Sequence, residues 1–327
     1  TNGEEAVYVL GQTTFTGSSL GNTQTGMNDP FGLAYDDVNG RLFVSQITNN
    51  RVTIYDLSTT TSNGEAAVNV LGQSTFTATA AANTQAGMND PYGLDYDNTN
   101  GLLYVAGRTN NRVTVYDLST TTSNGEAAVN VLGQTTFTGS SLGNTQSGMN
   151  DPYGIVYDNV NKYLYVSQIG NDRTAIFDVT AITNGENAAN LLGQFDDTAT
   201  PTPSYTKSGL NNSPNKYGLS APRGMAIDTS TNRLFLADTT NNRVLIYNLN
   251  NSNLLVDVTP DNVLGQNDFY TNTASNTQTG LNQPYSLAYD KVNNRLFVAG
   301  YGNNRVTVYD MTSTTNGEAA TYVLGQS

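Results

Sequence analysis

Short stretches in which apolar and polar residues alternate recur along the whole chain. The first group comprises Pro30–Asp36, Arg41–Ser45, Arg51–Asp56 and Ala67–Leu71. Alternation with a period of two residues is typical of a β-strand that buries one face. Segments rich in Asn and Gly, such as residues 36–40, separate the stretches and favour tight turns, because these residues tolerate positive φ angles. The pattern therefore predicts four short antiparallel strands in each group.

A tetrapeptide of the form apolar-Leu-Gly-Gln ends each group and occurs six times. Its final residues are 61, 61, 60, 72 and 60 positions apart: Gln12, Gln73, Gln134, Gln194, Gln266 and Gln326. Regular internal repetition indicates that each unit is one structural module. The units are 12–72, 73–133, 134–193, 194–265 and 266–326, and the fourth carries an insertion between Pro201 and Pro222.

Four-stranded sheets repeated around an axis leave only short, protected edges. We therefore predict an all-β fold, a β-propeller of five four-stranded repeats in which residues 1–327 form a single domain. The repeated third strand carries an aromatic residue in one phase, which is expected to pack between neighbouring blades: Tyr55, Tyr116, Phe177, Tyr247 and Tyr309. An Arg recurs at the start of the same strand, where we expect it to bind carbonyl groups between blades: Arg51, Arg112, Arg173, Arg243 and Arg305.

The repeated positions resemble those of the NHL repeat. In unit one the matching residues are Pro30, Gly32, Asp36, Leu42, Phe43, Val44, Asn49, Arg51, Val52 and Tyr55. Unit two matches with Pro91, Gly93, Asp97, Leu103, Tyr104, Val105, Asn110, Arg112, Val113 and Tyr116. Unit five departs from the pattern with Ser286 in place of the Gly. The resemblance covers nearly the whole chain and implies a propeller, commonly one with six blades.

One copy of the fourth strand is surplus, because six copies accompany five copies of the other three strands. Residues 1–12 (TNGEEAVYVLGQ) align with residues 315–326 (TNGEAATYVLGQ). Three explanations stay open: the chain is a segment of a longer repeat protein with six blades, the spare strand packs on its own ring, or it adds to a neighbouring molecule. The candidate assembly residues are Val7, Tyr8, Val9, Leu10, Tyr322, Val323 and Leu324.

Departures from the repeat mark a candidate ligand site at the channel mouth. The loops after the second strands differ between units, and Asp95 replaces an Ala or Val found elsewhere. Asp95 with Arg108 is expected to form an ion pair or one half of a polar site. The candidate ligand-binding residues are Asp95, Arg108, Gln46, Gln168, Asp238 and Tyr301. The insertion in unit four adds a basic-aromatic cluster at the same face: Lys207, Tyr205, Lys216, Tyr217 and Arg223.

Composition narrows the chemistry. The chain has no Cys, His or Trp, which excludes disulfides, zinc sites built on Cys or His, and Ser-His-Asp triads. A net charge of −13 disfavours binding to nucleic acids or anionic membranes. No apolar run is long enough to predict a membrane span, and no signal peptide is evident, which favours a mature or excised fragment. Asx turns explain the abundant Asp and Asn; calcium is the alternative, since turns such as 97–100 offer oxygen ligands.

These observations favour a non-catalytic propeller, either extracellular or at the cell surface, that binds protein or glycan or assembles with its own copies. The alternative is a calcium-dependent enzyme of the lactonase or lyase type with a site at the channel mouth. Known NHL lyases rely on metal-binding His, which this chain lacks. No catalytic residue, metal ligand or cofactor is assigned.

Overall fold

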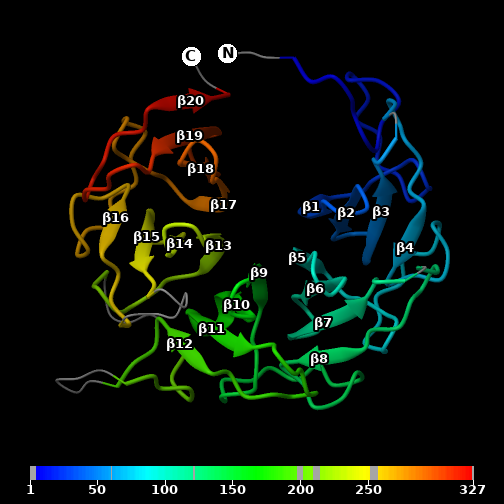
Figure 1. Cartoon of the computed structure of the whole chain (residues 1–327), viewed down its shortest axis with the longest axis horizontal. Coiled ribbons are helices and arrows are strands. Elements are labelled where there is room, and N and C mark those ends of the chain that lie inside the picture. The colour runs from blue at the N-terminus through cyan, green and yellow to red at the C-terminus, as the bar shows by residue number, and fades with distance from the viewer. Residues whose placement is uncertain are drawn as a thin grey trace.

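The computed structural model describes residues 5–59, 61–120, 122–196, 202–208, 214–250 and 257–325. These residues form five separate four-stranded antiparallel sheets, and in each the strands lie in sequence order. Figure 1 shows the sheets arranged around a central axis, with the first strands innermost and the fourth strands at the rim. The predicted all-β fold, a propeller of five four-stranded blades, is confirmed.

Corresponding strands have closely matched bounds. The first strands are β1 (Pro30–Asp36), β5 (Pro91–Asp97), β9 (Pro152–Asp158), β13 (Pro222–Asp228) and β17 (Pro284–Asp290). The second strands are β2 (Arg41–Gln46), β6 (Leu102–Gly107), β10 (Tyr163–Gln168), β14 (Arg233–Asp238) and β18 (Arg295–Gly300). The third strands are β3 (Arg51–Asp56), β7 (Arg112–Asp117), β11 (Arg173–Asp178), β15 (Arg243–Asn248) and β19 (Arg305–Asp310).

The fourth strands are short: β4 (Asn69–Leu71), β8 (Asn130–Leu132), β12 (Asn190–Leu192), β16 (Asn262–Leu264) and β20 (Tyr322–Leu324). One 3₁₀ turn, η1 (Ile169–Asn171), follows β10. Among the described residues, no helix is long and apolar enough to cross a membrane.

The turn between the first and second strands is fixed by the carboxylate that ends the first strand. In blade 1, Asp36 Oδ1 accepts hydrogen bonds from the backbone N–H groups of Val38 (3.1 Å) and Asn39 (3.0 Å). Burial raises the pKa of Asp36, but hydrogen bonds from Asn39 and Arg41 outweigh it, so the net pKa lies below its usual value. The Asx-turn interpretation of these residues is confirmed for this position.

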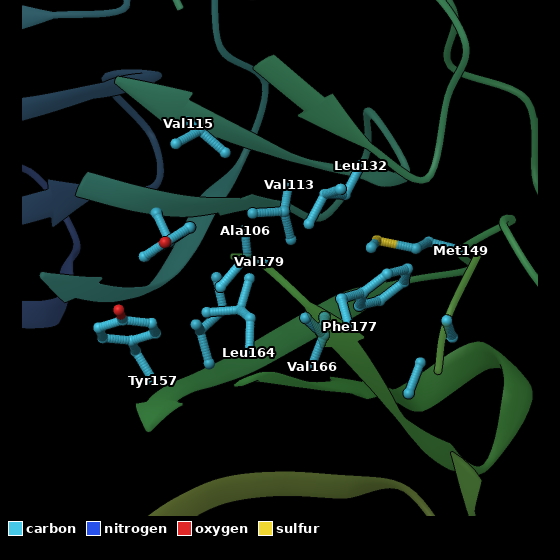
Figure 2. Packing of buried hydrophobic residues seen from close by; sticks show 14 residues of the cluster. Ala106, Val113, Val115, Leu132, Met149, Tyr157, Leu164, Val166, Phe177 and Val179 are labelled. Atoms are coloured by element: carbon cyan, nitrogen blue, oxygen red, sulfur yellow. The ribbon is translucent and has the colours of Figure 1, made fainter. Parts of the chain in front are cut away.

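The apolar core lies between blades. Figure 2 shows one such layer, in which Phe177 of β11 packs with Val113 of β7, Leu132 of β8 and Met149. The third-strand aromatic residue is fully buried in every blade. In blades 2 to 5 it packs against the preceding blade, as expected; in blade 1, Tyr55 packs on Leu10 and Met27 of the N-terminal segment.

A buried guanidinium at the start of the third strand connects the loops of successive blades in blades 1 to 4. Arg112 is 1% exposed; it donates to the carbonyls of Thr84 (2.9 Å) and Gly87 (3.2 Å) in the loop before its own blade, and to Phe137 O in the loop of the next blade. Arg51, Arg173 and Arg243 make the corresponding pairs of contacts. The clamp role predicted for this Arg is confirmed in these four blades.

The ring is open between blade 5 and blade 1. Successive first strands contact one another from β1 to β17, but β17 and β1 do not form such a contact within the part of the chain described. In Figure 1 the N-terminal segment from residue 5 and β20 border this opening. Residues 1–4 of the predicted surplus strand lie outside the described residues, while its remainder borders blade 1.

We predict that an Arg at the start of a third strand contributes more to stability when its side chain is more deeply buried. Arg112→Met should lower the free energy of unfolding by about 3 kcal/mol, because the carbonyls of Gly87 and Phe137 inside the junction lose their donor. Arg305→Met is the matched control, since Arg305 is half-buried and donates only to the carbonyls of Asn276 and Thr277, both in an exposed loop. Its loss should cost at most about 1 kcal/mol. Chemical denaturation of both variants checks this, and equal losses would contradict it.

Candidate functional site

The first strands of the five blades surround a central cavity of about 490 Å³. Its wall includes residues from each blade, among them Leu33, Asp95, Tyr157, Met225 and Tyr289. Except for Asp95, this wall consists of apolar and tyrosyl side chains and glycines, with Ser286 in blade 5. A cavity of this size and lining at the axis of a propeller is a suitable place for a small ligand.

One mouth of the cavity carries a group of aromatic rings that contact one another in tilted and edge-to-face arrangements. The second position of the first strand holds Phe31 in blade 1, Tyr92 in blade 2 and Tyr153 in blade 3. The ring centroids of Phe31 and Tyr92 are 4.8 Å apart, those of Tyr92 and Tyr153 4.7 Å, and those of Phe31 and Tyr153 5.2 Å. These spacings are those of favourable aromatic pairs.

Arg223 continues this group of side chains across the mouth. Arg223 occupies the same position in blade 4, and its guanidinium carbon lies 5.1 Å from the centroid of Tyr153 and 3.9 Å from that of Tyr285 in blade 5. Both distances are within the range of cation–π contacts. The Nε of Arg223 is buried and has no hydrogen-bond partner among the described residues.

Tyr301 and Arg108, two of the ligand-binding residues predicted in the loops after the second strands, also contact these rings. Tyr301 stacks on Tyr285 with centroids 4.6 Å apart, and it is 65% exposed. Arg108 lies over the ring of Tyr92 at 5.3 Å and donates to the Tyr92 hydroxyl (3.1 Å). We refer to Phe31, Tyr92, Tyr153, Arg223, Tyr285, Arg108 and Tyr301 together as the mouth cluster.

The expected ion pair between Asp95 and Arg108 does not form. Asp95 is opposite Tyr104 in the strand register, whereas Arg108 lies four residues further along, about 13 Å away at the rise of a strand. Arg108 instead pairs with Asp151 across the blade boundary, with 3.3 Å between Nε and Oδ1. Burial lowers the pKa of Arg108, but the hydrogen bonds to Tyr92 and Asp151 raise it above its ordinary value.

Asp95 faces the cavity and accepts two backbone hydrogen bonds. Its Oδ1 accepts from the N–H of Tyr96 (2.8 Å), and its Oδ2 accepts from the N–H of Tyr157 in the next blade (2.7 Å). Burial raises its pKa to about 6 despite these hydrogen bonds, which favour the charged form. Asp95 is therefore a carboxyl group at the cavity wall that titrates close to neutral pH.

The other three predicted ligand residues, Gln46, Gln168 and Asp238, are fully buried and support the arginine clamp instead of facing the channel. The carbonyl oxygen of Gln46 accepts from Arg51, that of Gln168 from Arg173, and Asp238 forms a 2.8 Å ion pair with Arg243. All three end a second strand opposite the Arg that begins the third strand, so their side chains point into the blade boundary.

The basic-aromatic cluster expected from the unit-four insertion is not brought together. Only Arg223 reaches the mouth. The carbonyl of Tyr205 accepts from Arg173 (2.7 Å), Lys207 donates to the carbonyl of Phe195 (2.9 Å), and Lys216 lies over Phe269. Tyr205 thus takes the place that Phe76 and Phe137 occupy at other junctions.

Sequence reasoning missed most of the mouth cluster, because the second residue of each first strand was interpreted as part of a structural repeat. The sequence does contain a signal, because an aromatic residue or Arg follows the repeated Pro in every unit. The five dipeptides after this Pro are Phe-Gly, Tyr-Gly, Tyr-Gly, Arg-Gly and Tyr-Ser. No group of three or more Asp, Glu, His or Cys side chains suited to a metal ion occurs in the described ranges. The calcium expectation stays untested.

Comparisons with known proteins agree on the fold. No curated protein is similar enough in sequence to count as a relative. A solved structure described as a nidogen/laminin complex contains a chain similar to this one, with a TM-score of 0.56 and 16% identity over 92% of this chain and 82% of that chain. Identity this low supports the fold alone. The NHL assignment of the repeats stays a prediction, whereas the propeller it implied is confirmed.

A family model described as "Lactonase, 7-bladed beta-propeller" matches residues 2–197, which is more than half of the chain. The described structure has five blades, so the family's blade number does not carry over. On the strength of this match, the chain belongs to the lactonase family of β-propellers.

Proposed function

We propose that this protein is a non-catalytic binding module, extracellular or at the cell surface, that holds a neutral glycan at the mouth of its channel. The observation that carries the proposal is the mouth cluster. Blades 1, 2, 3 and 5 contribute an aromatic ring at one equivalent position and blade 4 contributes Arg223, so that a connected group of rings and a guanidinium lies across the axis.

The chemistry of the cluster suits sugar rings. Aromatic faces provide flat apolar surfaces, while tyrosine hydroxyls and guanidinium groups supply hydrogen bonds to ring hydroxyls. The guanidinium of Arg223 brings N–H donors to this group of rings. A neutral glycan is favoured over a polyanion because the protein carries a net charge of −13.

We expect Tyr301→Ala to weaken glycan binding about fivefold, since loss of one stacking ring costs on the order of 1 kcal/mol. Tyr270→Ala is the matched control: Tyr270 is 64% exposed, close to the 65% of Tyr301, but it makes no ring contact with the mouth cluster. An array of neutral and acidic oligosaccharides identifies the probe, and titration by tyrosine fluorescence measures affinity in a chain without Trp. Equal effects of the two substitutions, or no binding to any neutral glycan, would argue against the proposal.

A lactone hydrolase is the second candidate, favoured by the family match and by Asp95. A carboxyl group with a pKa of about 6 at a cavity wall is suited to general acid–base catalysis near neutral pH. The test is hydrolysis of a six-membered sugar lactone by the native chain and by Asp95→Asn. The enzyme would be favoured over the binding module if the native chain hydrolyses the lactone faster than the uncatalysed rate and Asp95→Asn does not.

The raised pKa of Asp95 also predicts how stability depends on pH. Because the folded-state pKa is raised, the folded protein binds this proton more tightly than the unfolded chain does, and stability falls as pH rises from about 4 to about 6. In Asp95→Asn this contribution is absent. From pH 4 to pH 7 the variant should therefore gain roughly 2–3 kcal/mol relative to the native chain. Denaturant titrations across this range measure the difference, and parallel curves would refute the assignment.

A further inference from the structure

The two blades that border the opening expose surfaces that are buried at every other junction. On the blade 1 side, Leu33 is 63% exposed, whereas its equivalent Leu94 in blade 2 is 6% exposed. On the blade 5 side, Leu324 is 41% exposed, whereas its equivalent Leu71 in blade 1 is fully buried. We call these two surfaces the open flanks.

The flank of blade 5 contains an unfilled socket. A cavity of about 220 Å³ is lined by Arg305, Ala320 and Val323 among others. At the junction after blade 1, the loop of the next blade delivers Phe76, whose carbonyl accepts from Arg51 and whose ring packs beside Ala67. Arg305 and Ala320 are the equivalents of Arg51 and Ala67, so the socket has the shape and the donor for another such phenylalanine.

The flank of blade 1 is bordered by the N-terminal segment 5–12, which forms no regular strand but repeats the contacts of a fourth strand. The N–H of Val9 donates to Asn63 Oδ1 (3.1 Å), and its carbonyl accepts from the N–H of Gly64 (2.9 Å). Val70 of β4 makes the same pair of bonds to Asn124 and Gly125 of the following blade. The segment 5–12 therefore lies where the fourth strand of a blade preceding blade 1 belongs.

This placement leaves the segment without the partner that every other fourth strand has. Val70 is opposite Thr53 of the third strand in its own sheet. No third strand lies beside Val9 in the described structure, and Val7 and Tyr8 are 73% and 54% exposed. We propose that the opening is a docking site for strands one to three of a further repeat of this type, with residues 5–12 supplying its fourth strand.

A second copy of the chain is a poorer occupant. Both flanks border one opening in the same ring (Figure 1). A copy that docked its blade 1 on blade 5 with the native geometry would bring four more blades into the space of the first ring. Three strands without a fourth match the opening, because the outer strand is already in place.

Ser286 sets the tightness of this junction. At the equivalent Gly32, an added Cβ would lie 2.2 Å from the carbonyl oxygen of Tyr92 in the next blade, a distance that forces the strands apart. Ser286 has a Cβ at this position, so the incoming first strand must lie further from β17 than at the other junctions. A glycine at position 286 would remove that obstacle.

The test extends the full chain after Ser327 with a copy of residues 75–118, which contain the loop and strands one to three of unit two. We expect a single melting transition about 5 °C or more above that of the native chain, because two exposed flanks become buried. Ser286→Gly should raise the melting temperature of the extended chain further. In the unextended chain the same substitution should lower it or leave it unchanged, since glycine weakens a strand that gains no neighbour.

A designed disulfide reports on the register. Thr114 is opposite Val131, the equivalent of Val9, so Val9→Cys combined with Thr→Cys at the copy of Thr114 should cross-link in a chain that has no other Cys. Thr16→Cys in place of Val9→Cys is the control and should not cross-link. Two separate melting transitions, no cross-link, or self-association that persists in the extended chain would each overturn the proposal.

Discussion

The guanidinium at the start of the third strand in blades 1 to 4 is the contact on which the other features of this propeller depend. Arg112 binds carbonyls of the loop before its blade and of the loop after it, so one buried charge fixes three consecutive segments. Burial lowers its pKa, but the ring of carbonyl acceptors replaces the lost water. Without this donor, the long polar loops between blades would leave buried backbone oxygens unpaired.

Because the loops are held this way, the first strands approach one another closely around the axis. Gly154 lies where a Cβ would meet the carbonyl oxygen of Arg223 at 2.1 Å, so only glycine fits beneath the next blade. The residue before this glycine is then turned toward the mouth and meets its equivalents. The contacts between Tyr92, Tyr153 and Arg223 are therefore a consequence of the same packing that closes the blade junctions.

The repeat made the fold predictable, and it also concealed the site. Four strands per blade, the Asp36 turn and the clamp at Arg112 follow from patterns that five units share. The mouth cluster could not be predicted in this way, because contacts between blades 1 and 3, such as Phe31 with Tyr153, depend on how far the ring curves. Gln46 and Asp238 were predicted as ligand residues because their position differs between units. In the structure they lie beside the clamp in the interior. The sequence pattern did not show which residues of neighbouring strands are opposite each other, and this register separates Asp95 from Arg108.

Departures from the repeat acquire meaning only from their position in the ring. Asp95 places a carboxyl group on the cavity wall where other blades have Ala or Val, and Arg223 puts a charge between two rings of the mouth cluster. Ser286 replaces the glycine of the other four blades at the one junction where no blade follows in the described structure. Gly32 and Gly154 lie in closed junctions with the neighbouring backbone only a few ångströms away, whereas the axis and the open flanks leave room for side chains. The same two places are where this propeller can contact another molecule.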